Sequence, residues 1–589
     1  MKRYIAPIIL LFVTFGLSAQ PVDTARFRLE YTPRLMSFSK LNQQPDMTDS
    51  SSEKVKFDYY ITPQRMDATF KPGTIPYSKV SPDALDKMYR NFIKVGFGYP
   101  LTPLAELSFH NLQDTKHSFG ANLHHYSYWA PQIGKVMKQY PYGPMSDTRV
   151  HLNFKKFFKN QTLYTAAGYN HEYNRYYGYR YNEWPIGDAG VFTVDPDNLK
   201  TQFHHANAMV GLASNYVLED KKLKQDVRVS YDFLHRGQWK DMEHDLGLNA
   251  FIAYDSRWAK ISGSQCYRLD LNLDYFNEKL FQQQEGQNAV LFVPEATAHF
   301  TIKEYHIIAG IGGVVDYNYG KTKGTVYPIA ELQLGIVPTI LDVYAGVNGN
   351  AHHNSLKDML YENPWLKPQL DTFKTTINYI NIYGGIKGNL VKKLNYNLSV
   401  HYSYARDLAF YRIDTTSDVA RNQFEVEYHN GNVLNLCLNI NYEVIKNLHL
   451  NFEANYWLYA LTKTKAAPYH KPELEFTFNG KYILKEKFVF DLNFDLAFGS
   501  KTLAYDDFFG KYTVQNMKPI LDFGIGFEYL INDHFAAFAN INNIAHQHYA
   551  RYFDYKSFGI NAMVGITYSF GHEPLKAPKK AKKIGTPAF

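Results

Sequence analysis

The most regular feature of the sequence is an alternation of apolar and polar residues with a period of two, repeated in segments of about ten residues. The segment 227–233 reads Val-Arg-Val-Ser-Tyr-Asp-Phe, and the segments 267–275, 448–454 and 488–496 alternate in the same way. Because successive residues of a β-strand point to opposite faces, each segment predicts a strand with one apolar and one polar face. Soluble β-sandwiches and membrane β-barrels both contain such strands, so the period alone does not distinguish them.

The lengths of the links between these strands do distinguish them. Between Tyr89 and Phe570 the pattern predicts about 22 strands, and short and long links alternate with steady parity. The short links include 113–116, 159–162, 392–393, 445–447, 485–487 and 531–533, and the long links include 130–146, 179–200, 353–374, 463–471, 499–511 and 545–557. Outer-membrane barrels have an even number of strands, short periplasmic turns and longer extracellular loops, whereas a sandwich has no reason to sort its links by parity. We therefore predict an all-β fold, a transmembrane barrel of about 22 antiparallel strands.

Composition and the N-terminal residues agree with an exported membrane protein. Tyr (48 residues) and Phe (41 residues) dominate an aromatic content of 16%, as expected for aromatic girdles at two membrane interfaces. Lys2 and Arg3 precede an apolar stretch over residues 5–17 and a small-residue cleavage site at 17–19, which predicts a signal peptide over residues 1–19. No apolar run long enough for a membrane helix follows, which excludes a helical bundle. We expect the mature chain in the outer membrane of a Gram-negative bacterium, with both termini in the periplasm.

Several function classes find no support in the sequence. Cys266 and Cys437 are too far apart in the chain to suggest a disulfide framework, and a net charge of +7 on 589 residues does not suggest nucleic-acid binding. Histidine pairs occur at 124–125, 204–205 and 352–353, but adjacent residues of a strand point to opposite faces, so we expect no metal site. Nucleophile-elbow, phosphate-loop and zinc-protease motifs are missing. We expect no enzyme and no cofactor.

The C-terminal end resembles a known family. Residues 538–544 read Phe-Ala-Asn-Ile-Asn-Asn-Ile, a Tyr-rich loop follows, and the last strand, 558–570, ends Gly-Ile-Thr-Tyr-Ser-Phe. This ending is similar to that of TonB-dependent receptor barrels, in which an Asn-Leu or Asn-Ile turn precedes a final strand that closes on Phe. The resemblance covers about residues 89–570, and it implies a receptor or transport barrel. Members of that family carry a globular plug of well over a hundred residues before the barrel, whereas residues 20–88 show no plug motif, so the resemblance extends to the barrel domain without its plug.

The predicted organisation has four parts. The signal peptide (1–19) is followed by a periplasmic or lumenal arm (20–88) with a short helix that begins at Ser81. The barrel spans 89–570, and a basic periplasmic tail completes the chain at 571–589. The lysines of this tail are Lys576, Lys579, Lys580, Lys582 and Lys583. Its composition is typical of a solvated tail, and it would also suit an electrostatic tether to a periplasmic partner.

Two groups of residues are candidates for function. The polar face of the strands predicts a lumen-lining set of mixed charge, typical of a hydrated wall or of a selective permeation path. A Tyr-rich segment predicts an extracellular aromatic loop, either as a continuation of the girdle or as a surface that stacks on glycans or anchors a protein. The lumen-lining set is Arg228, Asp232, Arg268, Asp270, Asp274, Glu453, Asp491 and Asp495, and the aromatic set is Tyr173, Tyr176, Tyr177, Tyr179 and Tyr181.

Three functions fit this reading. The first is a receptor or transporter-like barrel whose lumen is closed by the N-terminal arm or by another protein. The second is an accessory structural barrel of a machine for outer-membrane protein assembly or secretion. The third is a passive diffusion pore. Since a barrel this wide cannot fill its lumen with its own wall side chains, we expect partners among outer-membrane or periplasmic proteins, besides lipid and lipopolysaccharide, and no nucleic acid.

Overall fold

The computed structural model describes residues 91–571. Within this range it leaves out 112–115, 130–144, 179–199, 216–222, 257–262, 282, 369–372, 392, 416–422, 464–465, 507–510 and 558. The predicted signal peptide, the N-terminal arm with its helix, and the five lysines of the basic tail lie outside the described residues.

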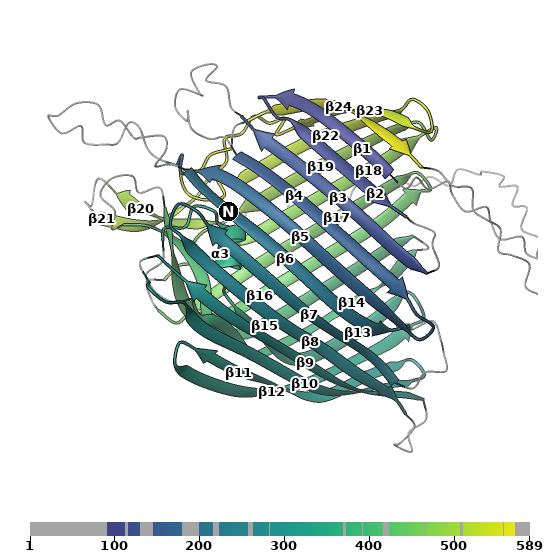
Figure 1. The fold of residues 1–589 in the computed structure, drawn as a ribbon. Helices are drawn as coiled ribbons and strands as arrows, with labels where there is room; N and C mark the ends of the chain where they lie inside the picture. Colours follow the sequence, from purple (N-terminus) through teal and green to yellow (C-terminus); the bar gives the residue numbers. More distant parts are fainter. Residues whose placement is uncertain are drawn as a thin grey trace, which may run out of the picture. The chain divides into compact units, whose positions relative to one another are not determined.

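Twenty-two strands form one closed antiparallel sheet, which confirms the predicted fold class (Figure 1). Consecutive strands pair in chain order, except that β19 pairs directly with β22, because β20 and β21 form a separate hairpin in the link between them. β1 closes the sheet on β24, with Asn91 opposite Phe570 and Tyr99 opposite Ala562. Closure leaves no unpaired sheet edge, which is the condition for strands to span a bilayer.

The strands have the following bounds. The first eleven are β1 (Asn91–Tyr99), β2 (Leu104–His110), β3 (His117–Tyr128), β4 (Met145–Phe157), β5 (Gln161–Arg175), β6 (Lys200–Ser214), β7 (Leu223–Arg236), β8 (Asp241–Asp255), β9 (Ser264–Lys279), β10 (Gln287–Ile302) and β11 (Tyr305–Asn318). The other barrel strands are β12 (Lys321–Val337), β13 (Leu341–His353), β14 (Thr375–Val391), β15 (Leu394–Ile413), β16 (Phe424–Ile445), β17 (Leu448–Leu461), β18 (Leu474–Leu484), β19 (Phe488–Phe498), β22 (Ile520–Leu530), β23 (Phe535–Asn542) and β24 (Asn561–Phe570). The separate hairpin consists of β20 (Lys501–Asp506) and β21 (Lys511–Asn516).

Large apolar side chains are exposed on one face of the closed sheet. In β7, Val227, Val229 and Tyr231 are exposed, and Leu390 of β14 and Val564 of β24 are among the most exposed apolar residues. An apolar outer face meets lipid, and the polar residues that alternate with it face the lumen. The barrel therefore lies in the outer membrane of a Gram-negative bacterium.

The two rims of the barrel differ in their links. Because the number of strands is even, β1 begins and β24 ends at the same rim, where Asn91 and Phe570 pair. The links at this rim are short, for example 303–304 and 446–447, whereas the opposite rim carries the longest links, such as 354–374, together with a few short ones such as 319–320. Outer-membrane barrels have short turns on the periplasmic side. The rim with both ends of the barrel is thus the periplasmic one, as the parity of the links predicts.

The wall is tallest at β14, β15 and β16, which contain 17, 20 and 22 residues. About 9–11 residues suffice to cross a bilayer, so these strands extend beyond the membrane on the extracellular side. Helix α3 (Leu356–Glu362) lies in the link between β13 and β14, and the hydroxyl of Ser355 caps its N-terminus by accepting a hydrogen bond from the backbone N–H of Asp358. In the described part of the chain, no helix is long and apolar enough to cross a membrane.

Candidate functional site

The described residues of the link between β13 and β14 (354–368 and 373–374), which we call the lid loop, fold inward over the extracellular mouth. At its base, the side-chain amide of Asn354 donates to the carbonyl of Lys374 at 2.5 Å and to the hydroxyl of Thr376 at 2.9 Å. These bonds tie the two ends of the loop together. With its two ends held together, the loop places α3 and its flanking residues against distant strands.

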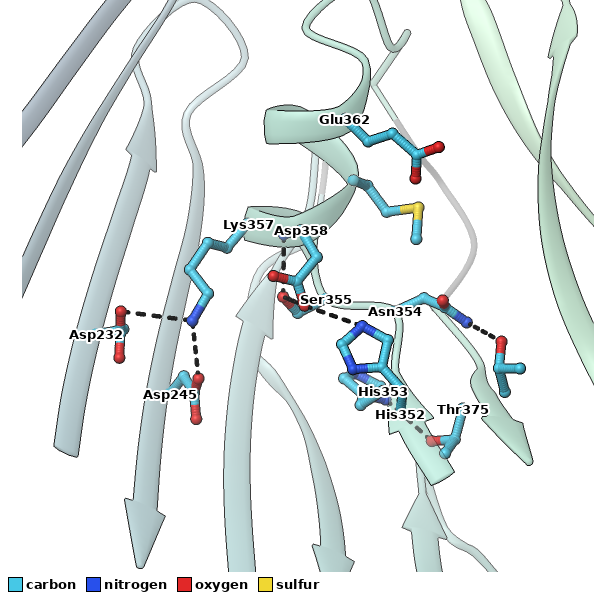
Figure 2. Close-up of polar contacts among 12 residues, drawn as sticks. Asp232, Asp245, His352, His353, Asn354, Ser355, Lys357, Asp358, Glu362 and Thr375 are labelled. Carbon is cyan, nitrogen blue, oxygen red and sulfur yellow. Dashed lines mark hydrogen bonds and ion pairs between the residues drawn. The ribbon is translucent and has the colours of Figure 1, made fainter. Parts of the chain in front are cut away.

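On one side, the lid loop reaches β7 and β8 through a shared cation (Figure 2). Nζ of Lys357 lies 3.1 Å from a carboxylate oxygen of Asp245 and 3.4 Å from one of Asp232. The backbone N–H of Lys357 also donates to the carboxylate of Glu243 at 3.2 Å. Burial disfavours the charged amine, but the carboxylates outweigh burial and hold the pKa of Lys357 above its usual value. We call Lys357, Asp232 and Asp245 the latch.

A histidine connects the latch to the next turn of α3. Nε2 of His205 lies 2.7 Å from Asp232, and Nδ1 lies 2.8 Å from the hydroxyl of Tyr361. The amide of Asn170 donates to the same hydroxyl at 2.9 Å. Strands β5, β6 and β7 therefore all contact α3 through polar side chains.

On the other side, the C-terminal end of α3 reaches β15 and two further links. The hydroxyl of Tyr411 donates to the Glu362 carboxylate at 2.9 Å, and Lys471 forms an ion pair with the same carboxylate. The hydroxyl of Tyr552, in the link between β23 and β24, donates to the Glu362 carbonyl at 2.8 Å. The helix thus connects parts of the wall that are far apart in the sequence.

Beyond α3, the lid loop pairs with the start of β16. Leu366 forms a parallel bridge with Phe424, in which the N–H of Phe424 donates to the Trp365 carbonyl at 3.0 Å and the N–H of Lys367 donates to the Phe424 carbonyl at 2.9 Å. Backbone bonds of this kind hold the loop at a fixed register on the strand end.

A buried arginine secures the same segment from β7. Arg236 donates from Nη1 to the Leu366 carbonyl at 2.9 Å and from Nε to the Asp241 carboxylate at 2.8 Å. The side chains of Arg236 and Asp241 are 1% and 0% exposed. A buried ion pair of this kind is stable only while both partners are present.

Apolar side chains fill the space beneath these polar contacts, and we call this cluster the mouth core. Links 176–199, 280–286, 354–374 and 543–560 all contribute to it, and the ring of Trp365 stacks on that of Tyr555 with 3.9 Å between centroids. Each large apolar side chain that is fully buried stabilises the closed arrangement by about 1.5–3 kcal/mol. The members of the mouth core are Tyr177, Phe203, Leu234, Leu280, Leu356, Met359, Leu360, Leu366, Phe373, Tyr411, Ile413, Phe424, Tyr552 and Tyr555.

His470, in the link between β17 and β18, packs on this core as a neutral side chain. Its Nδ1–H donates to the Tyr411 carbonyl at 2.7 Å, and its ring lies 5.2 Å from that of Phe424. Burial lowers the pKa of His470 to about 4, because the charged imidazolium loses its hydration there.

A second part of the lumen wall, from β14 to β22, carries two polar cavities. One of about 530 Å³ is lined by five asparagines and by charged residues that include Asp491. The other, of about 380 Å³, is lined by Glu453, Asp495 and Asp522 and by Tyr549 of the link between β23 and β24. A polar surface therefore extends from the periplasmic turns of β14–β19 toward the mouth.

The structure distributes the predicted lumen-lining residues over several places. Asp232 belongs to the latch, Glu453 and Asp495 share one cavity, and Asp491 lies in the other. The remaining four residues lie on β7 and β9: Arg268 pairs with Asp270 at 2.6 Å, while Arg228 and Asp274 occupy the same polar face. The eight residues do not converge on one site.

The described tyrosines of the predicted aromatic loop do not form an exposed surface. Tyr173 lies in β5, and Tyr176 and Tyr177 are buried, with Tyr177 packed in the mouth core and the Tyr176 hydroxyl donating to the Leu366 carbonyl at 3.1 Å. Tyr179 and Tyr181 lie outside the described residues.

The lid loop is the part of the site that the pattern of alternation misses. Residues 355–362 read Ser-Leu-Lys-Asp-Met-Leu-Tyr-Glu, with a capping serine and apolar residues at helical spacing, which is the signal that predicts α3. Its partners on β7 and β8 precede it by more than a hundred residues, and no local pattern indicates them. In the described ranges, no three His, Cys, Asp or Glu side chains are placed to hold a metal ion.

Comparisons of structure identify the fold, although no protein-family model and no curated protein matches the sequence. The ferripyoverdine receptor of the outer membrane of Pseudomonas aeruginosa, bound to ferripyoverdine, superposes with a TM-score of 0.61 at 11% identity, over 82% of this chain and 72% of the receptor. A variant of the ferric enterobactin receptor PfeA from Pseudomonas aeruginosa, in complex with enterobactin, gives a TM-score of 0.61 at 11% identity, over 83% of this chain and 82% of the receptor. The complex of FpvAI with pyocin S2 gives 0.61 at 12% identity, over 82% and 73%.

These proteins are TonB-dependent receptors. At such low identity the likeness concerns the fold, and it confirms the barrel fold that the C-terminal motif implies. The described residues of this chain form the barrel, its links and the lid loop, without a separate globular domain.

Proposed function

We propose that this chain is a receptor- or transporter-like outer-membrane barrel whose extracellular mouth is closed at rest by its own lid loop. The observation that carries the proposal is the convergence of four extracellular links on one buried core, with α3 held between β7–β8 on one side and β15 on the other. The fold shared with ferripyoverdine and ferric enterobactin receptors supports it.

The closure has the properties of a gate. Its polar part consists of discrete contacts, among them the latch and the bonds to Glu362, and its helix contains 7 residues. A small packed element of this kind can switch as a unit between two discrete packing arrangements, here one closed and one open. The polar cavities along β14–β22 would form the wall of the path when the lid loop moves.

Opening such a gate needs an input of free energy. A buried core and an ion pair favour the closed state, so a ligand or a protein must bind the open state more tightly in order to populate it. We therefore include partners in the proposal, either ligands at the extracellular face or other outer-membrane and periplasmic proteins, with lipid and lipopolysaccharide around the wall. The proposal includes no catalytic activity.

The same closure also suits an accessory structural barrel, because a barrel in an assembly or secretion machine must not leak. The two functions differ in whether the lid loop ever opens. A passive diffusion pore is not favoured, since a pore needs an unobstructed mouth.

Single-channel recording in planar bilayers tests the gate. We expect the full chain to conduct little, and a variant in which residues 356–366 are replaced by a Gly-Ser linker to conduct as a wide channel. Rare openings of the full chain that increase with a bound ligand or partner would support the receptor-like function. A full chain that conducts freely, or a linker variant that stays closed, would overturn the proposal. A full chain that never opens but co-purifies with partners in stoichiometric amounts would favour the accessory barrel.

A further inference from the structure

Six asparagines lie in one register row across six consecutive strands, β14 to β19. Each faces the next directly across a strand pair, in the order Asn389, Asn395, Asn441, Asn451, Asn479 and Asn493. Residues opposite one another in register share a face of the sheet. We call this row the asparagine ladder.

The ladder faces the lumen. Its residues alternate with apolar residues of the outer face, such as Leu390 and Phe490, which are exposed to the membrane. Five of its six members line the cavity of about 530 Å³ next to the periplasmic turns. A solute in the periplasmic half of the lumen therefore reaches the ladder without any movement of the lid loop.

The ladder keeps unused hydrogen-bonding capacity. The Asn451 amide donates to Asn441 at 2.8 Å, and the Asn479 amide lies 3.5 Å from Asn451. Each side-chain amide has two donors and an oxygen with two lone pairs, so contacts between neighbours leave donors and acceptors directed into the lumen. A purely structural amide network would instead be buried and fully satisfied.

Charge beside the ladder is balanced in sign. Lys393 forms an ion pair with Glu443 at 2.5 Å, and Lys481 lies opposite Asp491 in register. An anionic or cationic ligand would gain little from such a surface, because it meets both signs at similar distance. A neutral ligand with many hydroxyl groups matches the ladder, since hydroxyls both donate and accept, as amides do.

We infer that the asparagine ladder binds a neutral polyhydroxylated chain, such as an oligosaccharide, on the lumen wall. Successive amides are separated by the spacing between strands, about 4.8 Å, so the row presents the same polar group repeatedly to a chain that carries hydroxyls along its length. The inference deepens the proposed function, on which it rests, by naming the chemical class of solute that the wall would take.

Isothermal titration of the full chain tests the ladder, in a detergent without a sugar headgroup, with maltohexaose and laminarihexaose as neutral probes and oligogalacturonate as an anionic one. The ladder variant is Asn441→Leu with Asn479→Leu. The matched control is Asn249→Leu with Asn272→Leu, a lumenal pair opposite each other on β8 and β9 that adjoins Arg228 and no further asparagine. We expect a neutral probe to bind the full chain and the control alike, and to bind the ladder variant at least about tenfold more weakly.

A second ladder variant, Asn441→Ser with Asn479→Ser, serves if the leucine variant does not fold. It keeps the face polar, but its shorter side chains no longer place hydrogen-bonding atoms where the amides do, so it should lose binding in the same way. Failure of both neutral probes to bind the full chain overturns the inference. So does tighter binding of oligogalacturonate, or unchanged binding by folded ladder variants. Because titration uses the chain with its lid loop intact, its result is separate from the conductance test of the gate.

Discussion

Replacing Lys357 by methionine is expected to release the lid loop. Methionine keeps the length and the apolar stem of the side chain but removes the charge that Asp232 and Asp245 share. Both carboxylates would then remain, largely screened from water and without their cation. Their mutual repulsion and desolvation favour the open state, in which water reaches them.

The magnitude follows from the burial of the three groups. The side chains of Lys357, Asp232 and Asp245 are 17%, 20% and 13% exposed. Removing one partner of a fully buried ion pair costs about 3–5 kcal/mol, and this partial exposure places the latch at the lower end, about 3 kcal/mol. Since about 1.4 kcal/mol corresponds to a factor of ten, the ratio of open to closed barrels should rise about 100-fold.

Open probability in single-channel records measures this ratio directly. The matched control is Lys374→Met in the same loop, because Nζ of Lys374 lies 3.9 Å from Asp407 and its side chain is 53% exposed. An exposed pair contributes about 0–1 kcal/mol, so the control should change the open probability less than about fivefold. Adding Asp245→Asn to Lys357→Met should restore part of the closure, because it removes one of the stranded charges.

The reasoning fails if Lys357→Met stays as closed as the full chain while the Gly-Ser linker variant conducts. In that case the mouth core alone would hold the lid loop. Equal opening of the Lys357 and Lys374 variants would equally contradict it, since the distances and the exposure of the two lysines differ.

Two further predictions concern the stability of the closed mouth. Arg236→Met is expected to lower the free energy of unfolding by about 3–5 kcal/mol, because the Asp241 carboxylate stays buried without its partner. The double variant Arg236→Met with Asp241→Leu should lose much less stability. Equal losses for the two variants in urea titrations would contradict this account. Acidification should loosen the packing of His470, whose pKa is lowered to about 4 from the ordinary 6.5. Its neutral side chain stabilises the mouth fully above about pH 6.5, and this contribution, roughly 3 kcal/mol, is lost as the pH falls toward 4. Hydrogen exchange of residues 466–473, corrected for its intrinsic pH dependence, should become faster as the pH falls from 7.5 to 4.5 in the full chain but not in His470→Asn. A corrected exchange rate of the full chain that does not change with pH would refute the role of His470.

The barrel was predictable from the sequence because its determinants are local. Alternation such as that of 227–233 defines both faces of a strand within a few residues. The contrast between short links such as 446–447 and long links such as 354–374 can be counted directly in the sequence. In the structure 22 strands close into one sheet and the longest links lie at the extracellular rim, but that rim also carries short turns such as 319–320, where the parity of link lengths fails.

The contacts of the lid loop were not predictable in the same way, because they are non-local. The bond from Lys357 to Asp245 joins residues 112 positions apart, and Tyr552 reaches the carbonyl of Glu362 across 190 positions. Nothing in the sequence near Asp232 distinguishes it from the other charged residues of the polar strand faces, although only Asp232 among the predicted set pairs with the lid loop. The buried positions of Tyr176 and Tyr177 likewise depend on what folds over them.

The seam between β1 and β24 has a consequence for how the barrel is assembled. The other strand pairs of the barrel join consecutive barrel strands, with the β20–β21 hairpin inserted between β19 and β22, but the seam joins the first strand to the last, with Asn91 opposite Phe570. Tyr552 and Tyr555 of the mouth core belong to the link that immediately precedes β24, so the strand that closes the wall also carries part of the packing at the mouth. A barrel in which β1 and β24 have not yet paired is therefore open along its side, and closing this one seam completes the wall without any further strand.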